Sequence, residues 1–124
     1  SGLGDGTHQN YLTISNGSAL KRFGAGNAGY GHLVSISGLQ KCPELNIVYA
    51  YQESSLTSIG DTSTSKVDEY HLIGTQLSAT EMDRIFSDAA ASGVLNGTIY
   101  GNNSGTAASD ANKSTLRTRG WSIY

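Results

Sequence analysis

A short apolar template recurs along this chain and constrains the fold more than any other feature of the sequence. The template reads apolar-x-x-apolar-x-apolar-x-x-small, and its steps, measured at the second position, are 22, 25, 28 and 23 residues. Its copies are Leu20, Phe23, Ala25, Ala28; Cys42, Leu45, Ile47, Ala50; Val67, Tyr70, Leu72, Thr75; Leu95, Thr98, Tyr100, Asn103; and a truncated Trp121, Ile123. Such periods are typical of proteins whose units stack, because one unit cannot bury its apolar side alone.

Each copy has the alternation of a short β-strand, in which every second side chain points to the same face. We therefore expect strands around residues 46 to 50, 70 to 73, 98 to 101 and 121 to 123, paired in parallel and in sequence order. Trp121 and Ile123 would point into the core of the last rung. A second similarity, 23 residues apart, relates Leu33-Val-Ser-Ile to Leu56-Thr-Ser-Ile.

The stretch Leu-Ser-Ala-Thr-Glu-Met-Asp-Arg-Ile-Phe at 77 to 86 has carboxylates and an arginine, but it predicts the start of a helix. Ser78 and Glu81 form a capping box, in which each side chain accepts from the backbone N–H of the other residue. Asp83 and Arg84 lie off the apolar stripe of this helix. The pattern therefore assigns both of them to a solvated face.

A second helix is expected from about 107 to 119, with Thr106 as N-cap and Gly120 as its stop. Its predicted inner stripe is Ala108, Ala111, Thr115 and Leu116. The earlier copies have shorter return segments without helical periodicity. The expected fold class is therefore α/β: a short solenoid with a parallel sheet of about five rungs on its concave side, and loops followed by helices on its convex side.

The second half of the chain also resembles a known family. The stretch Ser-Gly-Val-Leu-Asn-Gly-Thr-Ile-Tyr-Gly-Asn-Asn at 92 to 103, Thr-Ala-Ala-Ser at 106 to 109 and the terminal Gly-Trp-Ser-Ile-Tyr resemble C-terminal leucine-rich-repeat segments of phage tail and virion surface proteins and of bacterial surface proteins. The resemblance implies a leucine-rich-repeat domain over residues 20–124, on a virion or an extracellular cell surface, within a longer polypeptide or virion assembly. Residues 1–19 are expected to form an N-terminal cap or linker.

Composition and charge exclude several function classes. The 124 residues make about one domain, and the net charge of -2 with scattered lysines and arginines gives no basic stripe for nucleic acid. No apolar run approaches the roughly 20 residues that cross a bilayer. The start of the chain lacks both an initiator Met and a signal-like segment, so we expect a soluble fragment or processed product of a longer protein. Cys42, the one cysteine, is interpreted as a buried small hydrophobe.

Sequence motifs of enzymes are missing. There is no Gly-x-Ser-x-Gly, Walker A or His-Glu-x-x-His motif, and His8, His32 and His71 lack metal-type spacing. We therefore predict a protein that is not an enzyme, with no catalytic residue, metal or cofactor. A carbohydrate-active enzyme domain is the alternative, although the expected concave rows carry no carboxylate pair of the kind that glycoside hydrolysis uses.

The concave face is then the candidate site. The candidate binding residues are Asn46, Val48, Tyr49, His71, Ile73, Ser122 and Tyr124. Aromatic and small polar side chains on a rigid sheet suit the recognition of a protein or a surface glycan. The expected function is a non-enzymatic binding or structural module, and a spacer or end cap whose concave face binds nothing remains an alternative.

Overall fold

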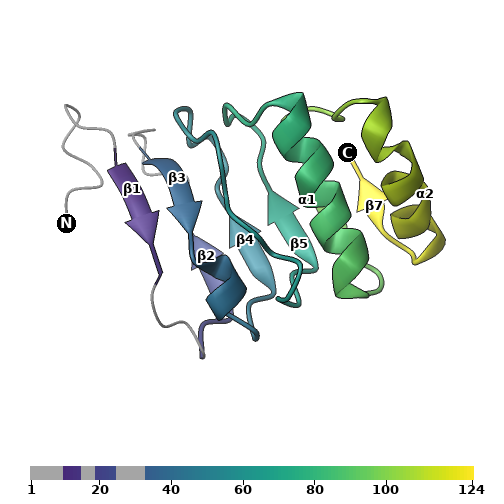
Figure 1. The fold of residues 1–124 in the computed structure, drawn as a ribbon, viewed down its shortest axis with the longest axis horizontal. Coiled ribbons are helices and arrows are strands. Elements are labelled where there is room, and N and C mark those ends of the chain that lie inside the picture. The colour runs from purple at the N-terminus through teal and green to yellow at the C-terminus, as the bar shows by residue number, and fades with distance from the viewer. Residues whose placement is uncertain (1–9, 15–18, 25–32) are drawn as a thin grey trace.

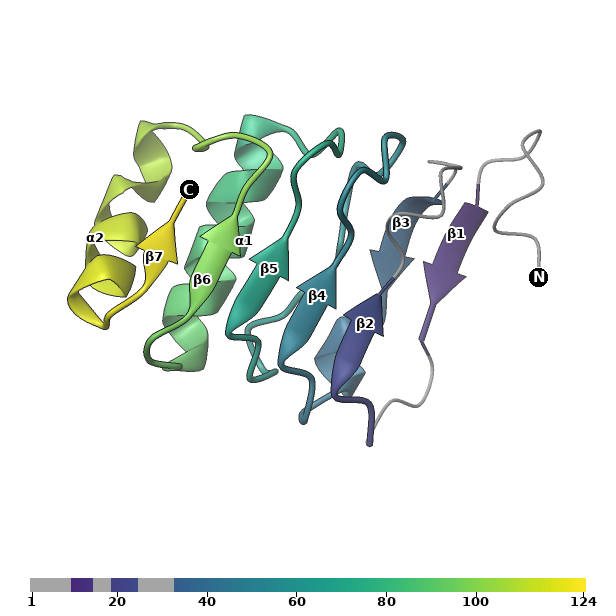
Figure 2. The ribbon, with the colours of Figure 1, turned by 180° about the vertical axis from the view of Figure 1, so that it is seen from behind.

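The fold is seen in a computed structural model, which describes residues 10–14, 19–24 and 33–124. Its main feature is a five-stranded sheet in the order β2-β4-β5-β6-β7, with every neighbouring pair parallel (Figure 2). The strands are β2 (Arg22–Gly24), β4 (Ile47–Tyr49), β5 (Glu69–His71), β6 (Thr98–Tyr100) and β7 (Ser122–Ile123). The predicted parallel pairing in sequence order is confirmed.

A second layer covers one side of this sheet. It begins with β1 (Asn10–Thr13) and β3 (Leu33–Ser37), which pair in parallel, followed by the short 3-10 helix η2 (Leu39–Lys41). Ser35 of β3 forms a parallel bridge with Ser58, so the two similar sequence segments lie side by side. The layer continues with α1 (Ala79–Ser92), the 3-10 helix η3 (Ala107–Ser109) and α2 (Asp110–Thr118) (Figure 1). We call this the helical side.

The core lies between the two layers and is built rung by rung. The residues that stand opposite one another in register and point inward are Phe23, Val48, Tyr70, Ile99 and Ile123. Met82, Ile85 and Phe86 of α1 are fully buried from the other layer. Burying apolar area in this way is the main driving force of folding.

Two rungs are out of phase with the sequence template. The placement of Val48 on the concave face is wrong, because the Val48 side chain is fully buried. The side chain of Ile99 is fully buried as well. The structure aligns Val48 with Tyr70 and Tyr70 with Ile99, so their sequence neighbours Ile47 and Tyr100 point outward. Since side chains alternate along a strand, a shift of one residue exchanges the two faces of a whole rung.

The first helix begins as predicted, with one change. The Ser78 hydroxyl accepts from the backbone N–H of Glu81 at 3.1 Å, and Gly93 ends the helix with a φ of 76°. The Glu81 carboxylate does not return to Ser78: Oε2 accepts from the backbone N–H of Ile59 at 3.2 Å and from Nη2 of Arg84 at 2.9 Å. Glu81 thereby joins α1 to the segment around Ile59, which precedes the helix in the layer.

The predicted solvated face of α1 is also wrong for Arg84. Its guanidinium bridges Glu81 and Asp88, and Asp88 Oδ2 accepts from the backbone N–H of Thr62 at 3.1 Å. Asp83 accepts from the backbone N–H of Thr106 at 2.7 Å and from its hydroxyl at 2.6 Å. These polar side chains therefore connect α1 to the segments on either side of it.

Burial and charge act in opposite directions within this network. Burial raises the pKa of Asp88, and the N–H of Thr62 and the charge of Arg84 offset only part of that effect. Burial also acts to raise the pKa of Glu81, but the hydrogen bonds and charge of Arg84 outweigh it and hold that pKa below its usual range. Tyr70, whose hydroxyl lies 2.8 Å from Thr62 Oγ1, has its pKa raised by burial.

The second helix starts at the predicted cap but presents a different stripe. Thr106 accepts from the N–H of Ala108 at 3.1 Å, and the first turn is the 3-10 helix η3. Ala108 and Ala111 are exposed, whereas Ser109 and Leu116 are buried. The stripe differs because the 3-10 turn has about three residues per turn, so the helix that follows is rotated relative to a continuous α-helix.

The last rung is closed by Trp121. Its ring is buried, its Nε1 donates to the carbonyl of Val94 at 2.8 Å, and its ring centroid lies 6.5 Å from that of Tyr70. Gly97 lies against the indole, since a Cβ at this position would come within 2.5 Å of the ring. Cys42 is buried as predicted, and burial raises the pKa of its thiol.

Candidate binding face

The side of the five-stranded sheet that faces away from the helices, here called the outer face, carries two rows of side chains. Both rows follow from the parallel register, which places equivalent residues of successive strands next to each other. The ladder row consists of Tyr49, His71, Tyr100 and Tyr124, and the proximal row consists of Ile47, Glu69, Thr98 and Ser122. The outer face is the one that the sequence analysis expects to be concave.

The rings of the ladder row contact one another in order along the row, and Tyr49 is tilted by 46° against His71. The centroids are separated by 5.0 Å between Tyr49 and His71, 4.8 Å between His71 and Tyr100, and 5.0 Å between Tyr100 and Tyr124. The last two pairs are close to parallel, with interplanar angles of 19° and 11°. This spacing is close to the separation of neighbouring strands, about 4.8 Å, so the sheet itself sets the stack.

The two ends of the ladder row differ. At the β2 end, where Gly24 occupies the equivalent position and has no ring, the Arg22 guanidinium lies 5.9 Å from the centroid of the Tyr49 ring. This distance permits a cation–π contact. At the other end Tyr124 stacks on Tyr100 alone and is 70% exposed.

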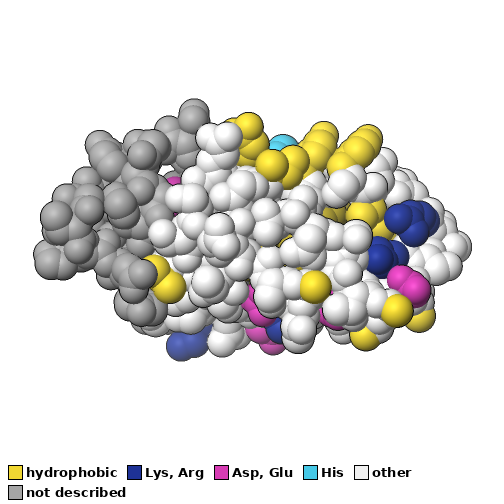
Figure 3. Space-filling model, turned by 90° about the horizontal axis from the view of Figure 1, so that it is seen from above, with side chains coloured by type: hydrophobic (Ala, Val, Ile, Leu, Met, Phe, Trp, Pro, Cys, Tyr) yellow, Lys and Arg dark blue, Asp and Glu magenta, His cyan; other side chains and the backbone are white. Residues whose placement is uncertain are grey.

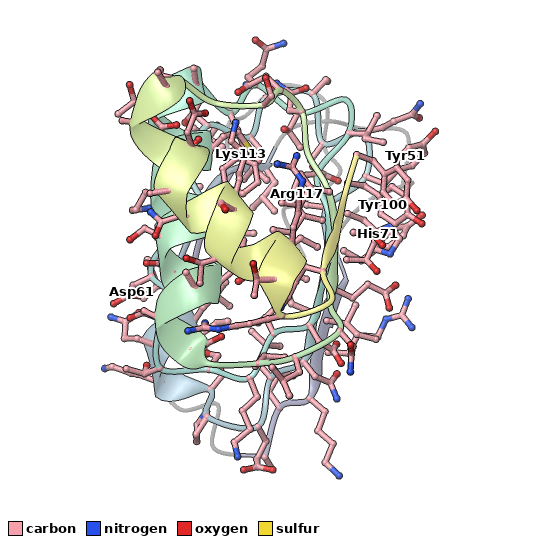
Figure 4. All side chains as sticks on the ribbon, turned by 90° about the vertical axis from the view of Figure 1, so that its right-hand side faces the viewer. Tyr51, Asp61, His71, Tyr100, Lys113 and Arg117 are labelled. Atoms are coloured by element: carbon pink, nitrogen blue, oxygen red, sulfur yellow. The ribbon has the colours of Figure 1, made fainter. Side chains whose placement is uncertain are left out.

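Stacking determines what the outer face offers to a ligand. Tyr100 is stacked on both sides, and His71 is stacked on Tyr100 and contacts the tilted ring of Tyr49 on its other side, so the edges and polar tips of both rings point outward. Figure 4 shows Tyr51, His71 and Tyr100 projecting together on the side opposite the helices. From above, the hydrophobic side chains form a group of parallel ridges along one edge of the molecule, with a histidine between them (Figure 3).

His71 is the one ring of the ladder row that has two polar ring atoms. Its Nε2 lies 2.5 Å from Oε2 of Glu69, which is two residues earlier on β5 and on the same face of the sheet. This contact fixes the ring orientation and leaves Nδ1 as the other polar ring atom.

The predicted site residues fall into three groups. Tyr49, His71, Ser122 and Tyr124 belong to the two rows, and Asn46 is exposed just before β4. Ile73 is 43% exposed beyond the ladder row, where its carbonyl accepts from the N–H of Gln52. Val48 lies in the core and is no longer a candidate.

Sequence reasoning missed Tyr100 and Glu69. The template assigns Tyr100 to the core, and Glu69 falls between two template positions. One signal could have found Tyr100: aromatic residues at 49, 71, 100 and 124 recur at nearly the same steps as the strands themselves.

The described part of the chain was also searched for metal-ligand clusters and membrane-spanning helices. Within residues 10–14, 19–24 and 33–124, no three His, Cys, Asp or Glu side chains gather as a metal site. His8 and His32 lie outside the described residues. The helices of the described residues are all too short or too polar to span a membrane. Comparisons with models of protein families, with curated proteins and with solved structures found no match to this chain.

Proposed function

We propose that this domain is a non-enzymatic recognition module that binds a protein or a surface glycan through the outer face of its sheet. The observation that carries the proposal is the row of aromatic rings on the outer face, Tyr49, His71, Tyr100 and Tyr124, of which the first three are half-buried and Tyr124 is exposed. Aromatic residues are enriched at the centres of interfaces, where they supply rigid contact area at low entropic cost.

The chemistry of the row narrows the contacts that a ligand would make. Tyrosine hydroxyls and ring edges point outward, and ring edges carry a partial positive charge. A ligand would therefore meet hydrogen-bond donors and positive edges along most of the row. Only the outer ring face of Tyr124 is left for stacking a sugar ring or an aromatic side chain.

We further propose that the fold is a leucine-rich-repeat-type solenoid and that the domain belongs to a virion or bacterial surface protein. The support for the solenoid is the parallel sheet in sequence order with recurring return segments. The support for the location is the sequence resemblance of the second half of the chain to phage tail and bacterial surface segments. The remainder of such a polypeptide or virion would then be a structural partner.

A carbohydrate-active enzyme domain is the second candidate, favoured by one observation: His71 and Glu69 form a close polar pair on the outer face. Glycoside hydrolysis generally uses two carboxylates, about 5 to 10 Å apart. Within the two rows described here, Glu69 is the one carboxylate. Binding without cleavage is therefore the better-supported function.

The experiment is retention on a panel of immobilised bacterial polysaccharides and on intact bacterial cells. Wild-type protein is compared with a Tyr100→Ser/Tyr124→Ser variant and with Ser87→Arg, a control on the exposed side of α1. We expect retention of wild type and control, loss of retention in the double variant, and glycans of unchanged length. Shortened glycans would favour the enzyme, and equal retention of all three proteins would place binding on another surface.

A further inference from the structure

The two rows of the outer face are complementary to each other in size and in charge. At β6 and β7 the ladder row has the large rings of Tyr100 and Tyr124, and the proximal row has the short Thr98 and Ser122. At β5 the rows have opposite polarity, with His71 in one and Glu69 in the other. The face therefore has a ridge of rings beside a strip that is lower at β6 and β7 than at β4 and β5, where Ile47 and Glu69 lie.

We propose that the occupant of the outer face is a second copy of this chain, related by a two-fold axis that runs across the strands between the ladder row and the proximal row. The proposal rests on the proposed function of this face as a recognition surface. Such an axis turns one copy over, so the ridge of each copy lies over the lower strip of the other. The rungs match along the whole face, because both copies have the same strand spacing.

The rungs of β6 and β7 then meet polar partners. Tyr100 lies over Thr98 of the second copy, and the hydroxyls can exchange hydrogen bonds, as they can between Tyr124 and Ser122. Every contact occurs twice, as the symmetry of such a dimer requires.

The charged rung selects this arrangement over its main alternative. His71 lies over Glu69 of the second copy, so Nδ1 faces a carboxylate that already holds Nε2 of its own His71. A two-fold axis along β5 would instead place Glu69 over Glu69, and like charges at an interface are costly.

The spacing of packed sheets is compatible with this dimer, and the size of the face limits its affinity. Sheets pack face to face about 10 Å apart with their strands nearly aligned, a distance at which tyrosine rings fill the space between them. Four rungs of two- or three-residue strands, about 4.8 Å apart, form a small face, so the contact area lies below that of standard-size interfaces and in the range of weak complexes. We therefore expect a dimer that dissociates on dilution.

Sedimentation velocity over a wide range of protein concentration tests the proposal. Thr98→Arg places a long cation in the lower strip, and Ser87→Arg makes a comparable change on the helical side. We expect wild type and Ser87→Arg to move from monomer toward dimer as concentration rises. The dissociation constant of Thr98→Arg should be at least about tenfold higher.

Two further variants make the test specific for the register. Ser122→Arg should act like Thr98→Arg and serves if the first variant is poorly folded by circular dichroism. Glu69→Lys should also weaken the dimer, because it removes the carboxylate that faces His71 of the second copy and puts a cation in its place. A dimer that resists all three changes would lie on another face, and the proposal would be overturned.

The outcome can be separated from that of the proposed function. A wild type that is monomeric at every concentration overturns the dimer, and retention of that monomer on glycans or cells would leave the recognition function standing. A dimer that Thr98→Arg dissociates, in a protein that no glycan or cell retains, supports the second copy as occupant and overturns an external ligand.

Discussion

The two sides of the sheet use their surface side chains in opposite ways. On the helical side, Glu81, Arg84 and Asp88 bond to one another and to backbone N–H groups of neighbouring segments. On the outer face, within the described residues, no hydrogen bond reaches the hydroxyls of Tyr100 and Tyr124. The charged residues, which look more functional in the sequence, are structural, and the aromatic rings are the groups left available for a ligand.

The largest effect is expected for Trp121, which lies in the core and belongs to neither surface. Trp121→Ala should lower the free energy of unfolding by roughly 3–5 kcal/mol, through loss of buried area and of the hydrogen bond to Val94. Urea denaturation measures this. A loss below about 1 kcal/mol would mean that the last rung adds little to the core.

The helical side should come next. Arg84→Met removes the partner of two carboxylates, one of which, Asp88, is buried, so we expect a loss of roughly 2 kcal/mol in the free energy of unfolding. Arg117→Met is the matched control, because Arg117 is exposed on α2. Equal stability of the two variants by urea denaturation would contradict a structural role for the α1 network.

A smaller loss is expected at the start of α1. Ser78→Ala removes the acceptor for the N–H of Glu81 and should lower stability by about 1 kcal/mol. Ligand retention should be unchanged, since Ser78 is not on the outer face. If the variant had the same free energy of unfolding as wild type, another group would have to accept from the N–H of Glu81 in place of Ser78.

The smallest effect concerns acid. Hydrogen bonds from the Thr106 hydroxyl and N–H lower the pKa of Asp83, so its contribution to stability is present above the usual aspartate range and is lost as pH falls through the lowered pKa. Asp88 acts with the opposite sign, because its pKa is raised. Asp83→Asn should therefore flatten the decline in stability below about pH 4, as measured by thermal melts at several pH values. An unchanged decline would assign the acid sensitivity to other carboxylates.

The limits of sequence reasoning follow from the same contrast. Strand positions, parallel order and the Ser78 cap were predictable because they depend on local patterns. The phase of β4 and β6 was not, because Ile47 and Val48, like Ile99 and Tyr100, are adjacent apolar residues. Alternation cannot choose between such neighbours, and only pairing with Tyr70 decides which one is buried.

The candidate site was predictable in part for the same reason. Tyr49, His71 and Tyr124 were found from the sequence, whereas Val48 was placed on the wrong side and Tyr100 was assigned to the core. The bonds of Glu81 and Asp88 to the backbone N–H groups of Ile59 and Thr62 could not be predicted, because these partners come from segments whose spatial order depends on the assembled layers. Polar contacts between distant segments carry no local signal.

The outward orientation of Tyr100 is tested most directly by a nuclear Overhauser spectrum of the aromatic protons. We expect cross-peaks from the Tyr100 ring to the rings of both His71 and Tyr124, since the centroids lie 4.8 and 5.0 Å away. Cross-peaks from Tyr100 to the core residues Leu72 and Trp121, without those to His71 and Tyr124, would contradict this orientation. In that case Tyr100 would point inward, and the outer face would have no continuous aromatic row.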